Sequence, residues 1–147
     1  MKKQLFISLL ALTAIIGVNI ESQACTSLLA GKKATTDGST LITYAADAHT
    51  LYGALKFIPA ATHEKGSMRE VRDWDTNKRW GEIPEAEQTY KVVGNMNEHQ
   101  LTITESTWTC KDELVDTTGI IDYGSLIYIT LQRAKTAREA IKIMTSL

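Results

Sequence analysis

The stretch ESQACTSLLAGKKATTDGST (Glu21–Thr40) places a cysteine directly before a predicted hairpin. Thr26–Gly31 is predicted to be a short buried strand, and Ser39–Ala46 has the β-branched and aromatic residues typical of a second strand. Between them, Asp37-Gly38 is a turn signal, because this pair tolerates the positive backbone angles of tight hairpins. The stretch therefore predicts an antiparallel hairpin whose first strand is led by Cys25.

Residues 1–24 are predicted to be a secretory signal peptide. Two lysines near the start are followed by a mostly apolar run, Leu5–Ile20, which is shorter than the ~20 apolar residues of a membrane-spanning helix. Signal cleavage favours small residues at the first and third positions before the cut, and Ser22 and Ala24 supply them. We therefore expect cleavage between Ala24 and Cys25 and export to the periplasm or the extracellular space. We expect no stable membrane span after processing.

Length predicts that residues 25–147 amount to a single domain, and charge argues against a nucleic-acid partner. The full chain has 147 residues and a formal net charge of −1. A nucleic-acid-binding protein usually carries a strongly basic face, so this balance argues against that class. His49, His63 and His99 lack metal-ligand spacing with the two cysteines. Neither a metal nor an organic cofactor is therefore expected.

The rest of the chain predicts further strands and then helices. Five segments have the composition or alternation of strands, namely Leu51–Ile58, Glu70–Trp74, Lys78–Ile83, Thr89–Gly94 and Gln100–Glu105. Asp122 is predicted to cap a helix that extends to Ala134, and a capping box at Thr136–Glu139 begins a second helix. The apolar stripe of the second helix comprises Ala137, Ala140, Ile141 and Met144. Many strands followed by paired helices indicate an α+β fold.

The residues around Cys25 are compatible with three roles for it. A bacterial lipoprotein anchor usually requires an aliphatic residue three places before the cysteine, where this chain has Ser22. A disulfide to Cys110, the other cysteine, is permitted in an exported protein. The third role is catalytic. Cleavage before Cys25 would give one residue both a thiol and an α-amine with a reference pKa of roughly 8, which can act as a base without a histidine.

Several segments, taken in order, resemble the cysteine dipeptidases of the secernin group. They are Cys25-Thr26-Ser27, Thr36-Asp37-Gly38-Ser39-Thr40, Ala46-Asp47, Gly94-Asn95-Met96-Asn97-Glu98-His99 and Asp122-Tyr123-Gly124-Ser125-Leu126. These enzymes are N-terminal-nucleophile (Ntn) hydrolases related to penicillin V acylases and bile-salt hydrolases. The resemblance implies an αββα layered fold. Complete members are considerably longer, so residues 25–147 are expected to be the N-terminal part of such a domain and to be inactive alone.

The resemblance also implies roles for particular residues. Cys25 corresponds to the nucleophile and, through its α-amine, to the base. Asp47 corresponds to the acid that polarises the amine and thiol, although a cap ahead of His49 is the simpler alternative. Tyr44 stands where the acylases usually carry a substrate-orienting arginine, and Thr107 lies near the position of their oxyanion-hole asparagine. Asn97 and Glu98 are expected to shape a turn rather than to contact substrate.

These observations predict an exported dipeptidase with an N-terminal cysteine nucleophile and a small peptide as substrate. An acylase acting on a non-peptide amide remains an alternative within the same fold. A lipoprotein or binding module anchored through Cys25, without chemistry, remains an alternative from another class. Substrate side-chain preference and oligomeric state do not follow from the sequence.

Overall fold

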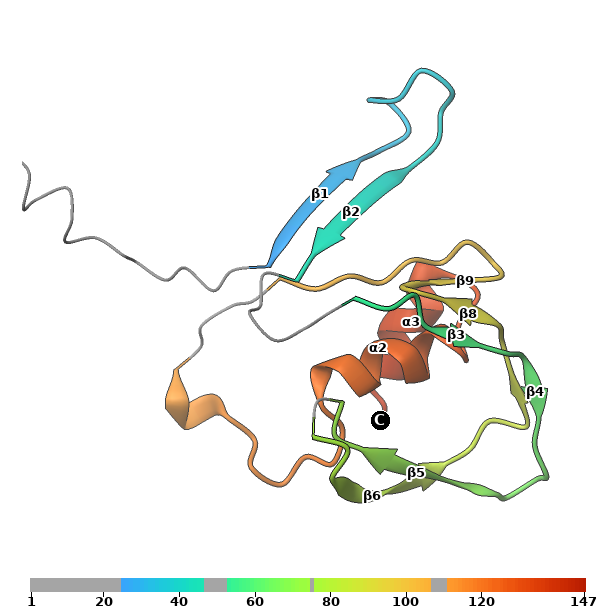
Figure 1. Cartoon of the computed structure of the whole chain (residues 1–147), viewed down its shortest axis with the longest axis vertical. Helices are drawn as coiled ribbons and strands as arrows, with labels where there is room; N and C mark the ends of the chain where they lie inside the picture. The colour runs from blue at the N-terminus through green and yellow to red at the C-terminus, as the bar shows by residue number, and fades with distance from the viewer. Residues whose placement is uncertain (1–24, 47–52, 75, 107–110) are drawn as a thin grey trace, which may run out of the picture.

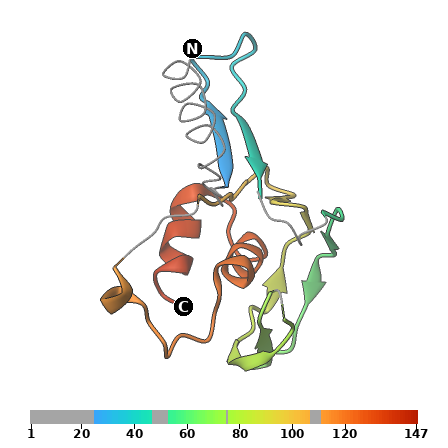
Figure 2. The same ribbon diagram turned by 60° about the vertical axis from the view of Figure 1, so that its left-hand side comes forward.

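A computed structural model describes residues 25–46, 53–74, 76–106 and 111–147 of the chain. Short antiparallel strands precede two C-terminal helices, which confirms the predicted α+β class (Figure 1). The hairpin at the beginning of the described chain projects from a body made of the other strands and the helices (Figure 2). Within these ranges, no helix has the length and apolar character needed to cross a membrane.

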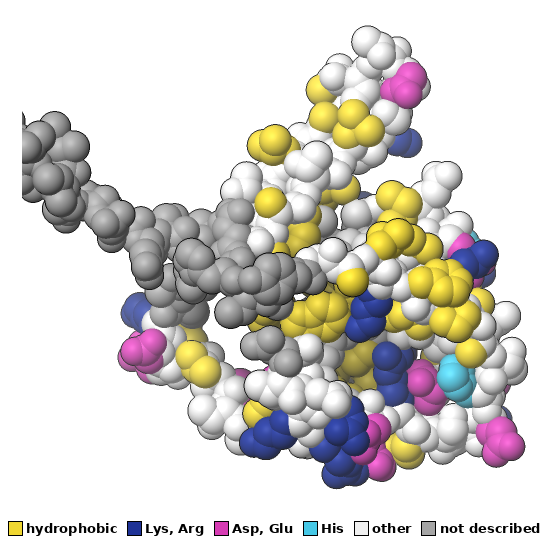
Figure 3. Space-filling view, in the orientation of Figure 1, with side chains coloured by type: hydrophobic (Ala, Val, Ile, Leu, Met, Phe, Trp, Pro, Cys, Tyr) yellow, Lys and Arg dark blue, Asp and Glu magenta, His cyan; other side chains and the backbone are white. Residues whose placement is uncertain are grey.

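The first two strands form the predicted hairpin. Strand β1 (Thr26–Ala30) pairs with β2 (Leu41–Ala45) in an antiparallel register that runs from Thr26↔Ala45 to Ala30↔Leu41. In the connecting loop, Gly38 has a φ of 75°, which is why glycine suits this position. The prediction that the first strand is buried was wrong, because Leu28 and Leu29 are 66% and 72% exposed. Apolar side chains are visible along this hairpin in Figure 3.

The remaining strands are short and pair antiparallel. They are β3 (Phe57–Ile58), β4 (Ala61–Thr62), β5 (Met68–Arg72), β6 (Arg79–Pro84), β7 (Gln88–Thr89), β8 (Val92–Val93) and β9 (Met96–Asn97). Strands β5 and β6 overlap the predicted segments Glu70–Trp74 and Lys78–Ile83 and form a hairpin, with Asn77 in the left-handed region of its turn at a φ of 59°. Strands β3, β8 and β9 form a three-stranded sheet, and β4 pairs with β7.

Three predicted strands differ from the structure. Within Leu51–Ile58, residues 53–56 are described and are not strand, so that only β3 remains. The segment Thr89–Gly94 is divided, because the Tyr90 N–H donates to the Gln132 carbonyl at 2.8 Å instead of continuing a sheet. Gln100–Glu105 forms only a single bridge, between Thr102 and Met96.

Both helices begin where their capping residues predict. Helix α2 (Tyr123–Leu131) is capped by Asp122, which accepts from the Ser125 N–H at 2.8 Å, and it ends before the predicted Ala134. Helix α3 (Ala137–Met144) begins with the complete capping box of Thr136 and Glu139. Ile141 belongs to the predicted apolar stripe of this helix, yet it is 58% exposed, whereas Ala140 is buried. A short 3-10 helix, Asp112–Leu114, precedes α2.

Two apolar clusters form the core. The larger core comprises Val92, Leu101, Ile127, Leu131, Ala134 and Ala140, and the smaller core comprises Val71, Ile83 and Ile129. Asn97 connects strand β9 to the end of α2, because its amide donates to the carbonyls of Leu131 and Ala134 at 2.8 and 2.6 Å. Its side-chain oxygen accepts from the N–H groups of His99 and Leu101. This arrangement confirms that Asn97 shapes a turn.

Candidate active site

The thiol of Cys25 lies beside a tyrosine and a carboxylate. Its Sγ is 3.8 Å from the Tyr44 hydroxyl and donates to Glu105 Oε1, also at 3.8 Å. At this length, both contacts are weak hydrogen bonds, as is usual for a sulfur atom. Cys25 is only partly exposed at the base of the β1–β2 hairpin. The structure therefore brings together the predicted nucleophile and a hydroxyl–carboxylate pair.

Tyr44 and Glu105 form the shortest contact of this group. The Tyr44 hydroxyl donates to Glu105 Oε1 at 2.6 Å. Burial, followed by this hydrogen bond to a carboxylate and by the neighbouring thiol, raises the pKa of Tyr44 well above its ordinary value. Tyr44 is thus a neutral phenol at physiological pH. It holds the carboxylate in place through its proton and presents its oxygen to the thiol.

Backbone pairing explains how the three residues meet. The register of the hairpin places Tyr44 opposite Ser27, two residues after the thiol. The Ser27 hydroxyl donates to the main-chain carbonyl of Glu105 at 3.0 Å. This bond fastens the segment that follows strand β9 to strand β1, although the two residues lie far apart in the chain. The Glu105 side chain is thereby brought within reach of both Cys25 and Tyr44.

A groove of about 520 Å³ opens beside this group. Its volume lies in the range of roughly 300–1,000 Å³ that is usual for small-molecule sites. The polar and aromatic side chains that line it are Tyr44, Lys56, Trp74, Asn95, Glu105, Tyr123 and Tyr128. We call this space the active-site groove. It combines aromatic surface with one carboxylate and one ammonium group among the lining residues.

Several other residues singled out in the sequence lie outside the described part of the chain, and the two described histidines have structural contacts. Asp47 and Thr107 lie outside the described residues, as do His49 and Cys110, so their predicted roles stay predictions. His63 bonds to the Thr89 hydroxyl at 3.2 Å, and His99 packs edge-on against Tyr90. The part of the chain that the structure describes has no cluster of three His, Cys, Asp or Glu residues able to hold a metal ion.

Glu105 belongs to the candidate site but was not predicted from the sequence. Glu105 is the last residue of the alternating segment Gln100–Glu105. A polar residue at the end of a predicted strand is common, so its position alone did not indicate a functional role. The available signal was its place in Glu105-Ser106-Thr107-Trp108, where the resemblance expects an oxyanion-hole donor. Contacts across 80 positions of sequence, such as that from Cys25 to Glu105, leave no local pattern to detect.

Comparisons with known proteins identify the family. The family model described as peptidase family C69 matches residues 24–64 and 55–147. No curated protein and no solved structure matches the chain. The family match begins beside Cys25 and extends to the last residue, and thus includes every residue placed above in the active-site groove. The chain belongs to peptidase family C69, the secernin-type family of cysteine dipeptidases that the sequence resemblance predicted.

Proposed function

We propose that this protein is an exported dipeptidase that uses Cys25 as an N-terminal nucleophile and has the layered fold of Ntn hydrolases. The observation that carries the proposal is the position of the Cys25 thiol, 3.8 Å from both the Tyr44 hydroxyl and the Glu105 carboxylate, beside a groove sized for a small molecule. The family match supports a cysteine-type peptidase. The predicted cleavage before Cys25 supports the N-terminal mechanism.

The first half of the reaction transfers an acyl group to the thiol. The α-amine of Cys25 takes the thiol proton, and the sulfur attacks the carbonyl carbon of the peptide bond. A carbon–sulfur bond forms and the carbonyl oxygen becomes an oxyanion. When this intermediate collapses, the carbon–nitrogen bond breaks. The leaving amine takes the proton and departs as the second amino acid.

The second half regenerates the enzyme. Water loses a proton to the α-amine and attacks the thioester, and collapse of this second oxyanion releases the first amino acid and returns the proton to sulfur. Glu105 holds the α-amine and the thiol in register during both halves. Its place within 3.8 Å of Sγ supports this role, because the α-nitrogen is only three bonds from the same sulfur. Tyr44 keeps Glu105 oriented through its 2.6 Å hydrogen bond.

The proposal is tested with secreted protein from the full coding sequence. N-terminal sequencing should find Cys25 first, and a panel of dipeptides should be hydrolysed. Replacement Cys25→Ala should reduce kcat to background, because no other group supplies the attacking sulfur. Protein that retains residues 1–24 should also be inactive, since its Cys25 nitrogen is part of a peptide bond.

Cys110→Ala is the matched control, because it removes the other thiol of the chain and should leave hydrolysis intact. Full activity of Cys25→Ala would contradict the catalytic assignment. An acylated Cys25 in the secreted product would instead favour the lipoprotein alternative. Activity restricted to amides that are not peptides would favour the acylase alternative.

A further inference from the structure

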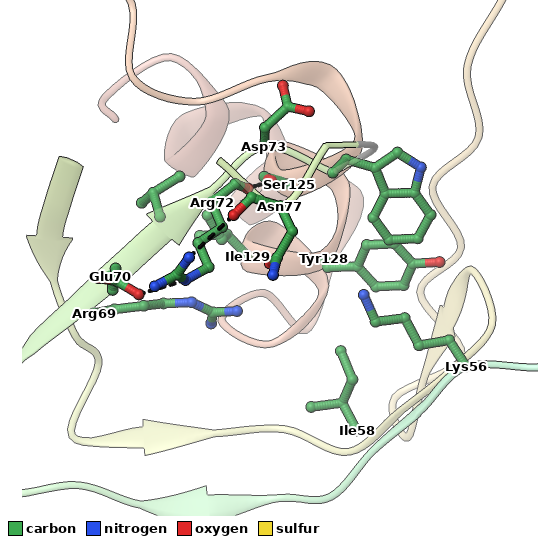
Figure 4. Close-up of a pocket in the computed structure, with 12 residues that line it drawn as sticks. Lys56, Ile58, Arg69, Glu70, Arg72, Asp73, Asn77, Ser125, Tyr128 and Ile129 are labelled. Carbon is green, nitrogen blue, oxygen red and sulfur yellow. Dashed lines mark hydrogen bonds and ion pairs between the residues drawn. The ribbon is translucent and has the colours of Figure 1, made fainter. Parts of the chain in front are cut away.

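Lys56, in the wall of the active-site groove, holds its ammonium group over two stacked aromatic rings. Its Nζ lies 4.3 Å from the ring centroid of Trp74 and 4.4 Å from that of Tyr128. The two rings stack on each other with centroids 5.0 Å apart. Lys56, Trp74 and Tyr128 also line a neighbouring pocket, and the view of that pocket in Figure 4 shows the Lys56 ammonium beside the Tyr128 ring. Such cation–π contacts fix the position of an ammonium without neutralising its charge.

No carboxylate among the described residues forms an ion pair with Lys56. Partial burial, and then repulsion by the positive charge of Arg69, lower the pKa of Lys56. Arg69 itself is engaged, because it donates to Gln132 Oε1 at 2.6 Å and lies 3.9 Å from Glu85. Lys56 is therefore the cation of this region that lacks an acidic partner within the described chain.

The two charges in the wall of the active-site groove have separate surroundings. Glu105 contacts Cys25 and Tyr44, whereas Lys56 contacts Trp74 and Tyr128. A dipeptide also carries two separated charges. Its ammonium is attached to the carbon next to the scissile carbonyl, and its carboxylate lies beyond the scissile nitrogen. A dipeptide whose carbonyl faces the thiol thus directs its amine toward the acidic part of the groove. Its carboxylate then points toward a basic part.

We propose that Lys56 is a specificity-determining residue that binds the C-terminal carboxylate of the substrate. Trp74 and Tyr128 hold its ammonium in position, and the substrate supplies the anion that the described residues do not. This inference rests on the proposed function and deepens it, because it names the group that selects peptides with an unblocked C-terminus. Longer peptides carry their carboxylate further along the chain and cannot place it at Lys56.

The test compares alanylalanine with its C-terminal amide, using the processed enzyme. A hydrogen bond to a charged group contributes about 1.5–3 kcal/mol, so wild type should prefer the acid by roughly 10- to 140-fold in kcat/KM. In Lys56→Met this ratio should fall to near one, through loss of activity on the acid alone. Unchanged activity on the amide shows that the catalytic group is intact. Lys56→Arg should recover part of the preference.

Lys65→Met is the matched control, because Lys65 lies in an exposed turn outside the groove. This variant should keep the wild-type ratio of kcat/KM for the acid to kcat/KM for the amide. Calorimetric binding to Cys25→Ala separates this inference from the proposed function, since it requires no hydrolysis. That variant should bind the acid more tightly than the amide, and Lys56→Met should abolish the difference. Equal affinity for both, or a ratio that survives Lys56→Met, overturns the role of Lys56 even if Cys25 is catalytic.

Discussion

At the scale of single residues, the contact between Tyr44 and Glu105 gives the candidate site its electrostatic character. A phenol that donates to a carboxylate at 2.6 Å cannot ionise without placing two negative charges side by side. Burial adds to this effect by disfavouring the phenolate. The resemblance expects a substrate-orienting arginine at position 44. The protein instead carries a neutral hydroxyl there, and its proton goes to a carboxylate of the same chain.

Replacement Glu105→Gln should move the pKa of Tyr44 back toward its ordinary value, because an amide does not repel the phenolate. The return should be partial, since burial remains the largest cause of the shift. Ultraviolet absorbance follows tyrosine ionisation, and the difference between each protein and its Tyr44→Phe derivative isolates this residue. An exposed-site change, Glu64→Gln, is the control. Identical titration curves for wild type and Glu105→Gln would contradict the contact.

The same shift has a consequence for stability. A folded-state pKa above the unfolded value of about 10 means that Tyr44 stabilises the fold below pH 10 and loses this contribution as the pH rises further. Urea unfolding of wild type should therefore weaken more steeply above pH 10 than unfolding of Tyr44→Phe. A parallel decline in both proteins would show that Tyr44 ionises as it does in the unfolded chain.

At the scale of elements, helix α2 depends on a close approach between Gly124 and Trp74. A Cβ atom added at position 124 would lie 2.6 Å from Trp74 Cγ. Alanine normally stabilises a helix by about 0.5–1 kcal/mol relative to glycine, but an overpacked site costs about 1–3 kcal/mol. The overlap should dominate here, because the obstacle is the root of a large ring system rather than the end of a flexible side chain.

Gly124→Ala is therefore expected to lower the free energy of unfolding by about 1 kcal/mol, as measured in urea, despite its better helix propensity. It should also move Trp74 and weaken the preference for substrates with a terminal carboxylate, since Lys56 rests on that ring. Gly31→Ala is the control, because nothing lies within 4 Å of its added Cβ. Unchanged stability together with unchanged tryptophan fluorescence would refute the close packing.

Elements defined by short-range signals were predictable from the sequence. Asp122 and Thr136 act on N–H groups three residues away, and both helices begin where these caps place them. The segment Gln100–Glu105 alternates as a strand should, but its backbone pairs with the short stretch Asn95–Asn97 that precedes it, where the Ile103 N–H donates to the Asn95 carbonyl at 3.1 Å. The Asn95 amide donates to the Ile103 carbonyl at 2.9 Å, and Leu101 turns into the larger core. Contacts with residues outside the segment therefore determine its structure.

At the scale of the whole molecule, α2 joins the two cores while the hairpin that carries Cys25 lies outside both. Ile127 and Leu131 pack in the larger core, and Ile129 packs in the smaller one. No residue of β1 or β2 is fully buried. An isolated two-stranded hairpin is marginally stable in water. The proposed nucleophile, Cys25, is therefore positioned by a weak element that is fastened to the body at the Glu105 segment.

Hydrogen exchange measured by mass spectrometry should separate these parts. Peptides from β1 and β2 should exchange by local opening, orders of magnitude faster than peptides from α2, which need the cores to open. Ser27→Ala removes the 3.0 Å bond to the Glu105 carbonyl, so it should speed exchange in the hairpin and leave α2 unchanged. Equal protection in both parts would mean that the hairpin unfolds only with the body. Faster exchange without loss of kcat in Ser27→Ala would mean that substrate, rather than this bond, brings the thiol into register.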